Sequence, residues 1–354
     1  MGIMARALRD AGVEIDVATT NDNDRELLQV PLGLPVDDDG VTYWYFQRTS
    51  HPYTTSAGLA RWLSGHVREY DVVHAHALFS FSTPLAATFA RRSRVPYVVR
   101  PLGTLARYGM QQHPLLKQIS WQLVEKRLLK GAAAVHFTSE AERAEASRLG
   151  NWRGVVVPIG VAFNDVRAQP TATELTFLFL GRIHPKKRLD LTLQGFAEAL
   201  RIEPTMRLRI AGDGEETYVN EMRALSDRLQ LSQQVEWLGH VSGSAKAQLL
   251  QTAHAFVLPS ENENFGIAAV EALAAGLPVI VTRGVAIHCE VEADNAGIVI
   301  DADAASLAKA LLTMRDAATR DAMSTNARAL ARNTFSIAAM QRGLIGMYEQ
   351  VLAK

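Results

Sequence analysis

Two glutamates, Glu263 and Glu271, lie eight positions apart in the stretch ENENFGIAAVEALAAG, residues 261–276. The run from Phe265 to Ala275 is apolar around nearly its whole circumference, which predicts a helix buried on most sides. An ionised carboxylate in such a helix is costly unless it is paired or surrounded by polar ligand atoms. Two interpretations of Glu271 therefore stay open: an ion pair with an arginine or lysine, or a place in a ligand cavity.

The residues before this helix are typical of an anion-binding turn. AFVLPS, residues 255–260, predicts a strand, and ENEN, residues 261–264, predicts a polar turn at the edge where parallel sheets bind ligands. Backbone N–H groups at the start of the helix favour a phosphate. Gly266 permits close approach, and Glu263 can accept hydrogen bonds from hydroxyl groups on the same ligand. The residues that would offer these N–H groups are Asn264, Phe265, Gly266 and Ile267.

A second strand, loop and helix occurs in FLGRIHPKKRLD, residues 179–190. Arg182 and Lys187 follow the strand and carry fixed positive charges that could neutralise a diphosphate without a metal ion. Three consecutive cations at residues 186–188 are, however, also typical of a solvated basic turn. Taken alone, this segment favours the second interpretation.

Short runs rich in valine, isoleucine and phenylalanine alternate with longer helical patterns along the chain. The alternation predicts an α/β fold in which helices cover both faces of parallel sheets. The strands predicted in the first half are residues 14–19, 41–46, 71–77, 96–100, 133–138 and 154–159. Those predicted in the second half are residues 176–181, 207–212, 235–239, 255–260, 278–282 and 297–300.

The two sets of strands indicate two domains. Residues 163–174 are polar and lack periodicity, so we expect them to be the linker. The predicted domains are 1–165 and 166–334, followed by a helix over 335–354 whose apolar face must pack on another element.

Composition sets bounds on the function. The chain has 354 residues, 48% hydrophobic and 21% charged, which is ordinary for a globular protein of about two domains. Lysine plus arginine and aspartate plus glutamate both total 37, so the charge balance gives no reason to expect nucleic acid as a partner. A single cysteine, Cys289, excludes an internal disulfide, and neither a signal peptide nor an apolar run of membrane-spanning length is visible. Together these features favour a cytoplasmic protein.

The beginning of the chain is unusual for this fold class. Residues 1–17 predict a helix that runs through Gly12 into a strand, whereas a doubly wound domain opens with a strand and a glycine-bearing turn. A first strand and its turn, about 10 to 20 residues by typical element lengths, are expected to be missing. The first sheet is then expected to have a gap in its middle.

Motifs in both halves of the chain resemble those of the retaining glycosyltransferases of family 4. The second half has Gly181-Arg182 with Lys187, AGDGEE at 211–216, VEWLGHV at 235–241 and PSENENFGIAAVEALAAGLPVI at 259–280. The first half has DVVHAH at 71–76, RPLGTL at 100–105, TSEAE at 138–142 and VVPIGV at 156–161. The resemblance covers nearly the whole chain, and the motifs are specific as a set.

The resemblance implies a GT-B architecture: two Rossmann-like domains facing a cleft, with the C-terminal helix crossing back to the first domain. It implies transfer of a hexosyl unit from a nucleotide-diphosphate sugar. Arg182 and Lys187 would hold the donor diphosphate and stabilise its growing negative charge, so neither a metal ion nor another cofactor is expected. Donor phosphate oxygen would act as the base, and no protein nucleophile would be needed.

Further roles are implied residue by residue. Glu271 would bind the ribose hydroxyls, and Glu263 would hold the sugar and phosphate together with the backbone at the helix start. Gly181 and Gly212 would belong to the donor site as well. On the acceptor side, the resemblance and the position at a strand's carboxyl end point to His76 and Gly103.

Two positions depart from the family pattern. Leu102 occupies the place of a histidine that contacts the transferred sugar in many relatives. Ile159 replaces a usual asparagine before the linker, which alters a loop more than the chemistry.

Four other motifs have weaker functional interpretations. Asp37-Asp38-Asp39 precedes Gly40 and a strand, so a solvated turn is favoured over a metal-binding triplet. Gly212-Asp213-Gly214 has Thr217 where a dinucleotide fingerprint needs its third glycine. His74 and His76 share one strand face without an evident third metal ligand. Ser139 with Glu142 is interpreted as a helix N-cap box, a structural feature.

A basic region spans residues 91–130, with nine cations opposed only by Glu125. It includes the helical pattern LLKQISWQLVEKRLLKGA, in which apolar residues alternate with cations. Two interpretations are retained: a solvated helix whose apolar side packs on its own sheet, or attachment to an anionic membrane surface. The second suits relatives that glycosylate lipid-linked acceptors.

The expected function is transfer of a hexosyl unit to a saccharide or lipid-linked saccharide, as in surface or exopolysaccharide synthesis, on the inner face of the membrane. Two alternatives remain open. One is an inactive nucleotide-sugar-binding protein, motivated by the missing first strand and by Leu102. The other is a different GT-B enzyme, such as a nucleotide-sugar epimerase.

Overall fold

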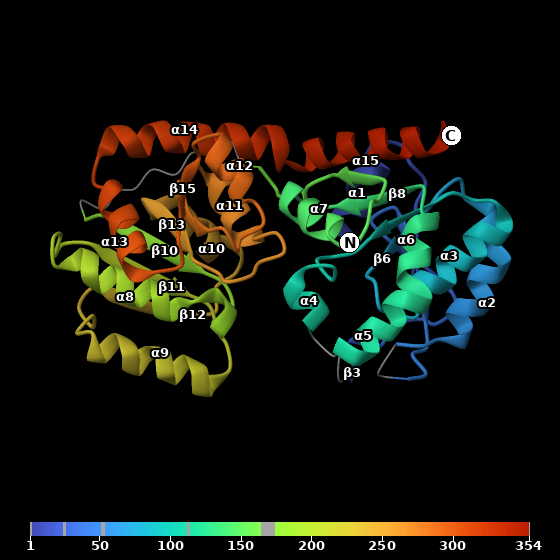
Figure 1. Cartoon of the computed structure of the whole chain (residues 1–354), viewed down its shortest axis with the longest axis horizontal. Coiled ribbons are helices and arrows are strands. Elements are labelled where there is room, and N and C mark those ends of the chain that lie inside the picture. The colour runs from blue at the N-terminus through green and yellow to red at the C-terminus, as the bar shows by residue number, and fades with distance from the viewer. Residues whose placement is uncertain (1, 24–25, 51–53, 112–113, 164–173, 354) are drawn as a thin grey trace. The chain divides into compact units, whose positions relative to one another are not determined.

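The computed structural model describes residues 2–23, 26–50, 54–111, 114–163 and 174–353. They form two compact units. Unit 1 is Met1–Gly160 with Ile337–Lys354, and unit 2 is Val161–Ser336 (Figure 1). Most of the predicted linker lies outside the described residues. Within those residues, no helix combines the length and the apolarity needed to cross a bilayer.

Unit 1 contains two separate larger sheets. In the first, β1 (Asp16–Thr20) pairs in parallel with β5 (Val41–Phe46), which pairs with the antiparallel strand β4 (Pro35–Asp38). The order of the second, all-parallel sheet is β6-β7-β8-β9. Its strands are Val73–His76, Tyr97–Arg100, Ala134–Phe137 and Gly154–Val156. The short strands β2 (Asp22–Asn23) and β3 (Glu26–Leu27) pair antiparallel.

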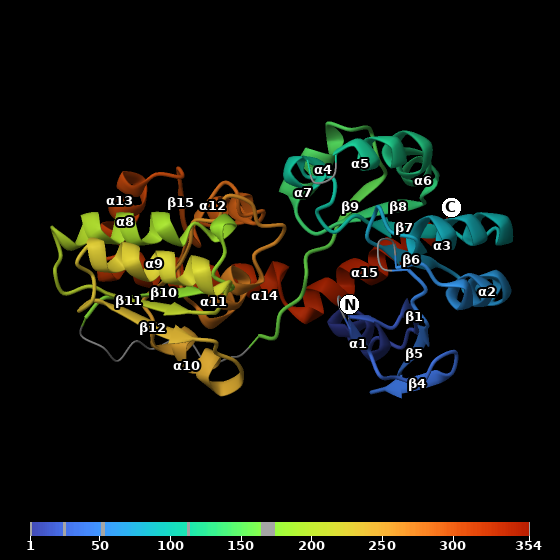
Figure 2. The same ribbon diagram turned by 90° about the horizontal axis from the view of Figure 1, so that it is seen from below.

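The same helices cover both sheets of unit 1. Helix α1 (Gly2–Asp10) packs Ala5 against Val17 of β1, while its Met4 contacts the cluster around Val98 of β7. The two sheets therefore lie side by side under α1, with β1 and β6 as neighbouring edges (Figure 2). No hydrogen-bonded ladder joins β1 to β6 in the described residues. Among the described residues, the strands of unit 1 therefore form two separate larger sheets and not one continuous sheet.

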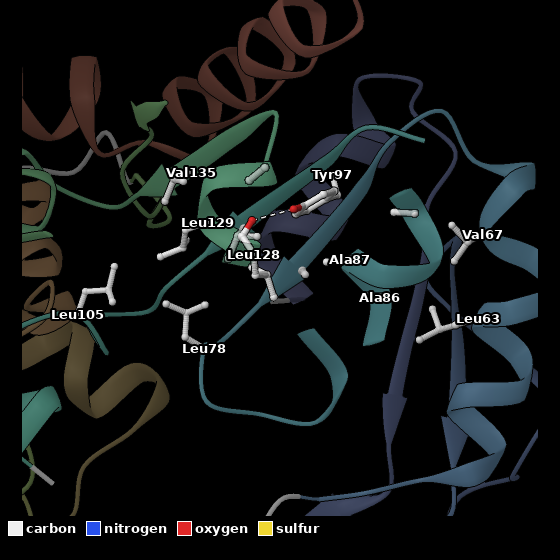
Figure 3. Packing of buried hydrophobic residues seen from close by; sticks show 14 of the residues in the cluster. Leu63, Val67, Leu78, Ala86, Ala87, Tyr97, Leu105, Leu128, Leu129 and Val135 are labelled. Carbon is white, nitrogen blue, oxygen red and sulfur yellow. Dashed lines mark hydrogen bonds between the residues drawn. The ribbon is translucent and has the colours of Figure 1, made fainter. Parts of the chain in front are cut away.

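Side-chain alternation divides the core of unit 1 into two layers. Val98 and Ala134 face α1 and the last helix, α15 (Ile337–Leu352), which contributes Met340, Leu344, Met347 and Val351. Val99 belongs to the opposite layer. Tyr97 and Val135 face that layer too (Figure 3). That layer includes α2 (Ala57–His66) and α3 (Ser82–Ser93). The remaining helices of unit 1 are α4 (Arg107–Gln111), α5 (Pro114–Ser120), the π-helical η2 (Trp121–Glu125), α6 (Lys126–Gly131), α7 (Glu140–Ser147) and the 3₁₀ turn η1 (Val67–Glu69).

The described residues of unit 2 contain one continuous parallel sheet of six strands, in the order β12-β11-β10-β13-β14-β15. The strands, in chain order, are β10 (Thr176–Leu180), β11 (Arg207–Ala211), β12 (Val235–Gly239), β13 (Ala255–Leu258), β14 (Val279–Thr282) and β15 (Gly297–Ile300). The helices and the 3₁₀ turn are η3 (Pro185–Lys187), α8 (Leu189–Leu200), α9 (Glu216–Arg228), α10 (Gly243–Thr252), α11 (Ile267–Ala275), α12 (His288–Ala293), α13 (Ala304–Thr313) and α14 (Ala317–Thr334). All twelve strands predicted from the sequence are present, and the α/β prediction is confirmed.

A chain of neutral side chains ties α15 to the sheet of unit 1. The Tyr348 hydroxyl lies 2.7 Å from His74 Nδ1, and His74 Nε2 lies 3.3 Å from His136 Nδ1. His136 Nε2 is 2.8 Å from the Val157 carbonyl. One set of tautomers satisfies the whole chain: Tyr348 donates to His74, His74 to His136, and His136 to Val157. In this arrangement both imidazoles are uncharged.

We expect unit 1 to lose stability as the pH falls below about 6.5. Burial, with the nearby Arg100 charge, lowers the pKa of His136 to about 3, and burial lowers the pKa of His74 well below its usual range. The unfolded chain, whose histidines titrate near 6.5, then binds more protons than the folded chain, so this stability is complete above pH 6.5 and is lost on acidification. Urea midpoints between pH 7.5 and 5.0, where exposed carboxylates stay ionised, measure the effect.

A matched pair of variants isolates this chain. His136→Gln retains a donor for the Val157 carbonyl but no longer titrates, so its urea midpoint should depend less on pH than that of the parent. His240→Gln, at an exposed histidine of unit 2, should leave the dependence unchanged. Equal pH dependence in parent and His136→Gln would contradict the assignment.

Candidate functional site

The sequence-predicted residues of the second half come together at the carboxyl ends of β10 and β13. These two strands are neighbours in the sheet, yet the chain leaves β10 toward β11 and leaves β13 toward β14 on the other side. Such a reversal of strand order opens a crevice between the two connections, and open α/β sheets bind their ligands there. The site can therefore be built from the two loops that follow these strands.

The loop after β10 depends on two glycines. Gly181 and Gly212 both have a φ of +150°, and a Cβ atom on Gly212 would lie 1.9 Å from the Gly181 carbonyl oxygen. Only glycine at position 212 allows the ends of β10 and β11 to approach this closely. Ile183 N then donates to the Asp213 carbonyl at 2.6 Å, which fixes the course of the loop that carries Arg182.

The loop after β13 is tied directly to the loop after β10. Glu261 N donates to the Lys186 carbonyl at 2.8 Å, and Glu263 N donates to the Gly284 carbonyl at 2.9 Å. A Cβ atom on Gly284 would lie 2.2 Å from the Glu261 carbonyl oxygen, so this contact too requires glycine. Backbone hydrogen bonds thus hold the predicted basic loop and the predicted acidic turn side by side.

Lys187 and Glu263 form an ion pair across the two loops. They lie 76 positions apart in the chain, and their side chains are about 19% and 24% exposed. A half-buried pair of this kind is held in one geometry more firmly than a surface pair. The solvated basic turn that the sequence left open does not describe Lys187, although Arg182 is exposed.

Positive charge accumulates around this pair. His184 caps η3, its Nδ1 accepting from Lys186 N at 3.2 Å. Partial burial lowers the pKa of His184, and the charges of Arg182, Lys186 and Lys187 lower it further. The loop after β10 therefore presents a cationic surface to any ligand at the strand ends.

Glu271 lies on α11, where Lys246 of α10 is its partner, with Nζ 2.7 Å from Oε1. Both side chains are half-buried, at 34% exposure for Lys246 and 28% for Glu271. Of the two interpretations of Glu271, the structure shows the ion pair. The helix is buried on most sides, as predicted: Ala272 and Leu273 face the core, and Glu271 lies on its half-exposed side.

The residues at the start of α11 can offer a ligand backbone N–H groups more readily than side chains. Gly266 has a φ of +85°, and a Cβ atom there would lie 2.9 Å from Val285 Cγ1, so the tight turn depends on glycine. Phe265 is buried and packs edge-on against Phe335, with ring centroids 5.7 Å apart. The Ile267 side chain is exposed. Of the predicted donor residues, Phe265 can thus offer a ligand only its N–H group.

In unit 1, His76 and Gly103 lie at the carboxyl ends of two adjacent strands. His76 ends β6 and pairs in register with Arg100 at the end of β7, and Gly103 lies in the loop beyond. The His76 ring stacks on His74 with centroids 4.5 Å apart, and burial and the Arg100 charge lower the pKa of His76 well below its usual range. His76 is accordingly a neutral hydrogen-bonding group at a sheet edge.

The loop with Gly103 has a support that the sequence did not reveal. Glu142 is buried and accepts from Gly103 N at 2.7 Å, from Thr138 N at 2.7 Å and from Thr138 Oγ1 at 2.8 Å. Ser139 Oγ accepts from Glu142 N at 3.1 Å, as an N-cap does. The N-cap interpretation is therefore incomplete, because the Glu142 carboxylate also fixes the loop that contains Leu102.

The weaker motifs are explained by structure. Asp38 and Asp39 lie beside Arg6 and Arg9 of α1, and the turn closes at Asp39 and Gly40 after β4. His74 has His136 as a near neighbour, but their nitrogens make a hydrogen bond. Across the described ranges, no three histidine, cysteine or acidic side chains are arranged to hold a metal ion.

Lys246 and Glu142 are the main residues that sequence reasoning missed. A basic partner for Glu271 was one of the two interpretations left open, but the sequence could not name it, because α10 and α11 meet only in the folded unit. Glu142 gave a signal, the cap motif, that concealed its second role.

Two family profiles together match almost the whole chain. Residues 2–161 match the profile described as a glycosyl transferase 4-like domain, and residues 163–330 match the glycosyl transferases group 1 profile. The matched ranges meet at the boundary between units 1 and 2.

Characterised relatives are glycosyltransferases. The chain is 28% identical to D-inositol 3-phosphate glycosyltransferase of Kineococcus radiotolerans over 73% of this chain and 67% of the relative. It is 34% identical to GDP-mannose:cellobiosyl-diphosphopolyprenol alpha-mannosyltransferase of Xanthomonas campestris over 60% of this chain and 56% of the relative. The second alignment thus leaves much of that relative unmatched.

Solved structures share the fold. Sucrose-phosphate synthase from Thermosynechococcus elongatus superposes with a TM-score of 0.74, covering 99% of this chain and 92% of that one at 21% identity. The Anabaena protein HepE in complex with UDP superposes with a TM-score of 0.71, covering 86% and 85% at 20% identity. At these identities the likeness establishes the architecture alone.

Proposed function

Because the chain belongs to the GT-B glycosyltransferases, we propose that it moves a hexosyl unit from a nucleotide-diphosphate sugar to an acceptor, with retention of anomeric configuration. One observation carries the donor part of this proposal. Lys187 and Glu263 meet at the strand-order reversal of unit 2, beside the glycine-bearing start of α11. A cation, a carboxylate and a helix N-terminus at that place suit a diphosphate joined to a sugar.

The donor diphosphate would bind between Arg182, Lys187 and the first N–H groups of α11. A phosphate oxygen that binds Lys187 would replace Glu263 as its counter-charge, and the Glu263 carboxylate would then accept hydrogen bonds from sugar hydroxyls. Glu271 would accept from the ribose hydroxyls, and Lys246 would keep its carboxylate oriented. Asn264, Gly266 and Ile267 would contribute backbone N–H groups only.

Catalysis would be electrostatic. As the bond from the sugar C1 to the diphosphate oxygen breaks, negative charge grows on the leaving diphosphate, and Arg182 and Lys187 stabilise it. The acceptor oxygen would bond to C1 from the same face, and its proton would pass to a diphosphate oxygen. In this scheme the two cations supply the charge that a metal ion supplies elsewhere, so no metal is required.

We place the acceptor near His76 and Gly103 of unit 1, both at the carboxyl edge of a parallel sheet. The acceptor class is a saccharide on a lipid carrier or a growing polysaccharide. The Xanthomonas relative, whose name specifies a cellobiosyl-diphosphopolyprenol acceptor and a GDP-mannose donor, supports this choice.

Two alternative functions rest on specific observations. The separate sheets of unit 1, and Leu102 in the place of the histidine that contacts the transferred sugar in many relatives, motivate the alternative of a protein that binds nucleotide sugar without transfer. A nucleotide-sugar epimerase would share the donor site but would need no acceptor. Transfer to an added acceptor distinguishes the proposal from both.

The first test is a thermal-shift screen of the purified chain with UDP-glucose, UDP-N-acetylglucosamine and GDP-mannose. At a donor concentration of about 100 times Kd, binding should stabilise the chain by about 2.7 kcal/mol. The stabilising donor is then incubated with and without a lipid-linked disaccharide. A new glycolipid supports transfer, whereas an epimerised free donor or an unchanged donor contradicts it in favour of one of the alternatives.

A further inference from the structure

One helical segment of unit 1 turns its apolar side chains to solvent. Helices α5, η2 and α6 run consecutively through residues 114–131 (Figure 1). Five aliphatic side chains within ten positions are 38% to 76% exposed. We name them the apolar stripe: Leu115, Leu116, Ile119, Leu123 and Val124.

The opposite face of the segment already makes the contacts that the fold needs. Trp121, Leu128 and Leu129 are buried in the core, and Trp121 packs edge-on against Trp152 with centroids 5.9 Å apart. The fold therefore does not use the apolar stripe. The first interpretation, an apolar side packed on its own domain, therefore holds for Trp121, Leu128 and Leu129, and the apolar stripe is a second apolar face that is exposed.

The charge around the apolar stripe has one sign. Between residues 107 and 131 the chain contains a single acidic residue, Glu125. Its carboxylate is buried and accepts from Phe79 N at 3.1 Å and from Ser120 Oγ at 3.2 Å, so it does not neutralise the surface. Three cations, Lys126, Arg127 and Lys130, follow the stripe along the same segment without a carboxylate at salt-bridge distance in the described residues.

We propose that the apolar stripe and these cations form a surface that docks on an anionic lipid bilayer. Aliphatic side chains from one helix face can enter the boundary between headgroups and acyl chains while neighbouring cations contact anionic headgroups. A second copy of the chain is a poorer occupant, because a two-fold interface would bring two sets of cations together. The surface belongs to unit 1 alone, so the inference stands whether or not donor transfer is found.

The test is sedimentation of the whole chain with sucrose-loaded vesicles. The chain should co-sediment with vesicles of phosphatidylcholine that contain 30% phosphatidylglycerol. Much less of the chain should co-sediment with vesicles of pure phosphatidylcholine, and a higher salt concentration should weaken the binding. The double variant Leu116→Ser/Leu123→Ser removes apolar area. The triple variant Lys126→Gln/Arg127→Gln/Lys130→Gln should lower the partition coefficient about 100-fold, at about fivefold for each cation near the surface.

A matched control is Ile202→Ser, which removes an equally exposed aliphatic side chain from unit 2. It should bind vesicles as the parent does. All substituted side chains are exposed or half-exposed, so circular dichroism and the melting temperature should stay near parent values. Loss of sedimentation in both the double and the triple variant, with retention in the control, supports docking. The proposal is overturned if all variants sediment equally or if the parent does not sediment with anionic vesicles. It is also overturned if the parent forms dimers that only the double and triple variants abolish.

Discussion

Lys187→Ala is expected to lower the rate of sugar transfer at saturating donor by a factor of about 10² to 10³, the usual effect of removing one charge-stabilising group from an active site. The lysine is the cation of the half-buried pair with Glu263, and in our proposal it contacts the leaving diphosphate. Its removal also leaves the Glu263 carboxylate facing that diphosphate, which adds repulsion. The measurement is kcat from initial rates of product formation.

Two companion variants make this result specific. Lys186→Ala changes the neighbouring cation of the same turn and should alter kcat by less than about threefold if the effect depends on position and not on total charge. Lys187→Ala/Glu263→Gln should recover donor affinity relative to Lys187→Ala, because the repelling carboxylate is gone, while kcat stays low. A lysine variant with parent kcat would exclude Lys187 from charge stabilisation. Equal losses in the two single variants would mean that general electrostatics decide the rate.

Glu271→Ala is expected to raise the donor Kd by about 10-fold to 100-fold, since hydrogen bonds to a charged group contribute about 1.5–3 kcal/mol. The carboxylate lies on α11 with one oxygen held by Lys246 at 2.7 Å, which leaves its second oxygen to accept from ribose hydroxyls. Calorimetric titration with the nucleotide diphosphate measures the change. Lys246→Ala should have a smaller effect, because the carboxylate is still present.

A ligand change tests the same contact from the other side. The 2′-deoxy nucleotide should bind the parent more weakly than the ribonucleotide, and Glu271→Ala should bind the two with nearly equal affinity. If the variant still discriminates between them as strongly as the parent, Glu271 does not contact the ribose and serves only the ion pair with Lys246.

The sequence was sufficient wherever one local pattern determined one element. Val98, Val99 and their neighbours in β7 are apolar on both sides, as a strand between two helix layers must be, and the strand is found as predicted. The loops with Arg182 and Glu263 were also predictable, because the strand–turn–helix order places them at one edge of a parallel sheet.

The sequence was insufficient wherever two distant residues decide the environment of a third. The exposure of Glu271 depends on how α10 packs against α11, and no local sequence pattern determines that packing. The apolar stripe shows the same limit: helical spacing predicted apolar faces around Trp121, but which face meets the core depends on the neighbours of the segment. Leu116 and Leu128 are similar in sequence context and opposite in burial.

The division of the unit 1 layer into two sheets has a mechanical consequence. In the part of the chain that the structure describes, β1 and β6 are held together by covering helices and side-chain contacts, such as the Tyr70 hydroxyl on Asp16, and not by a ladder of backbone hydrogen bonds. The two halves can move apart along this seam without breaking a single strand pair, whereas any opening of the continuous sheet of unit 2 must break one. Local opening should therefore begin at the seam, and amides of β1 and β6 should exchange with solvent before those of β10 and β13. Two unpaired edges exposed by the same motion would also make the seam the place where a foreign strand can add to the fold.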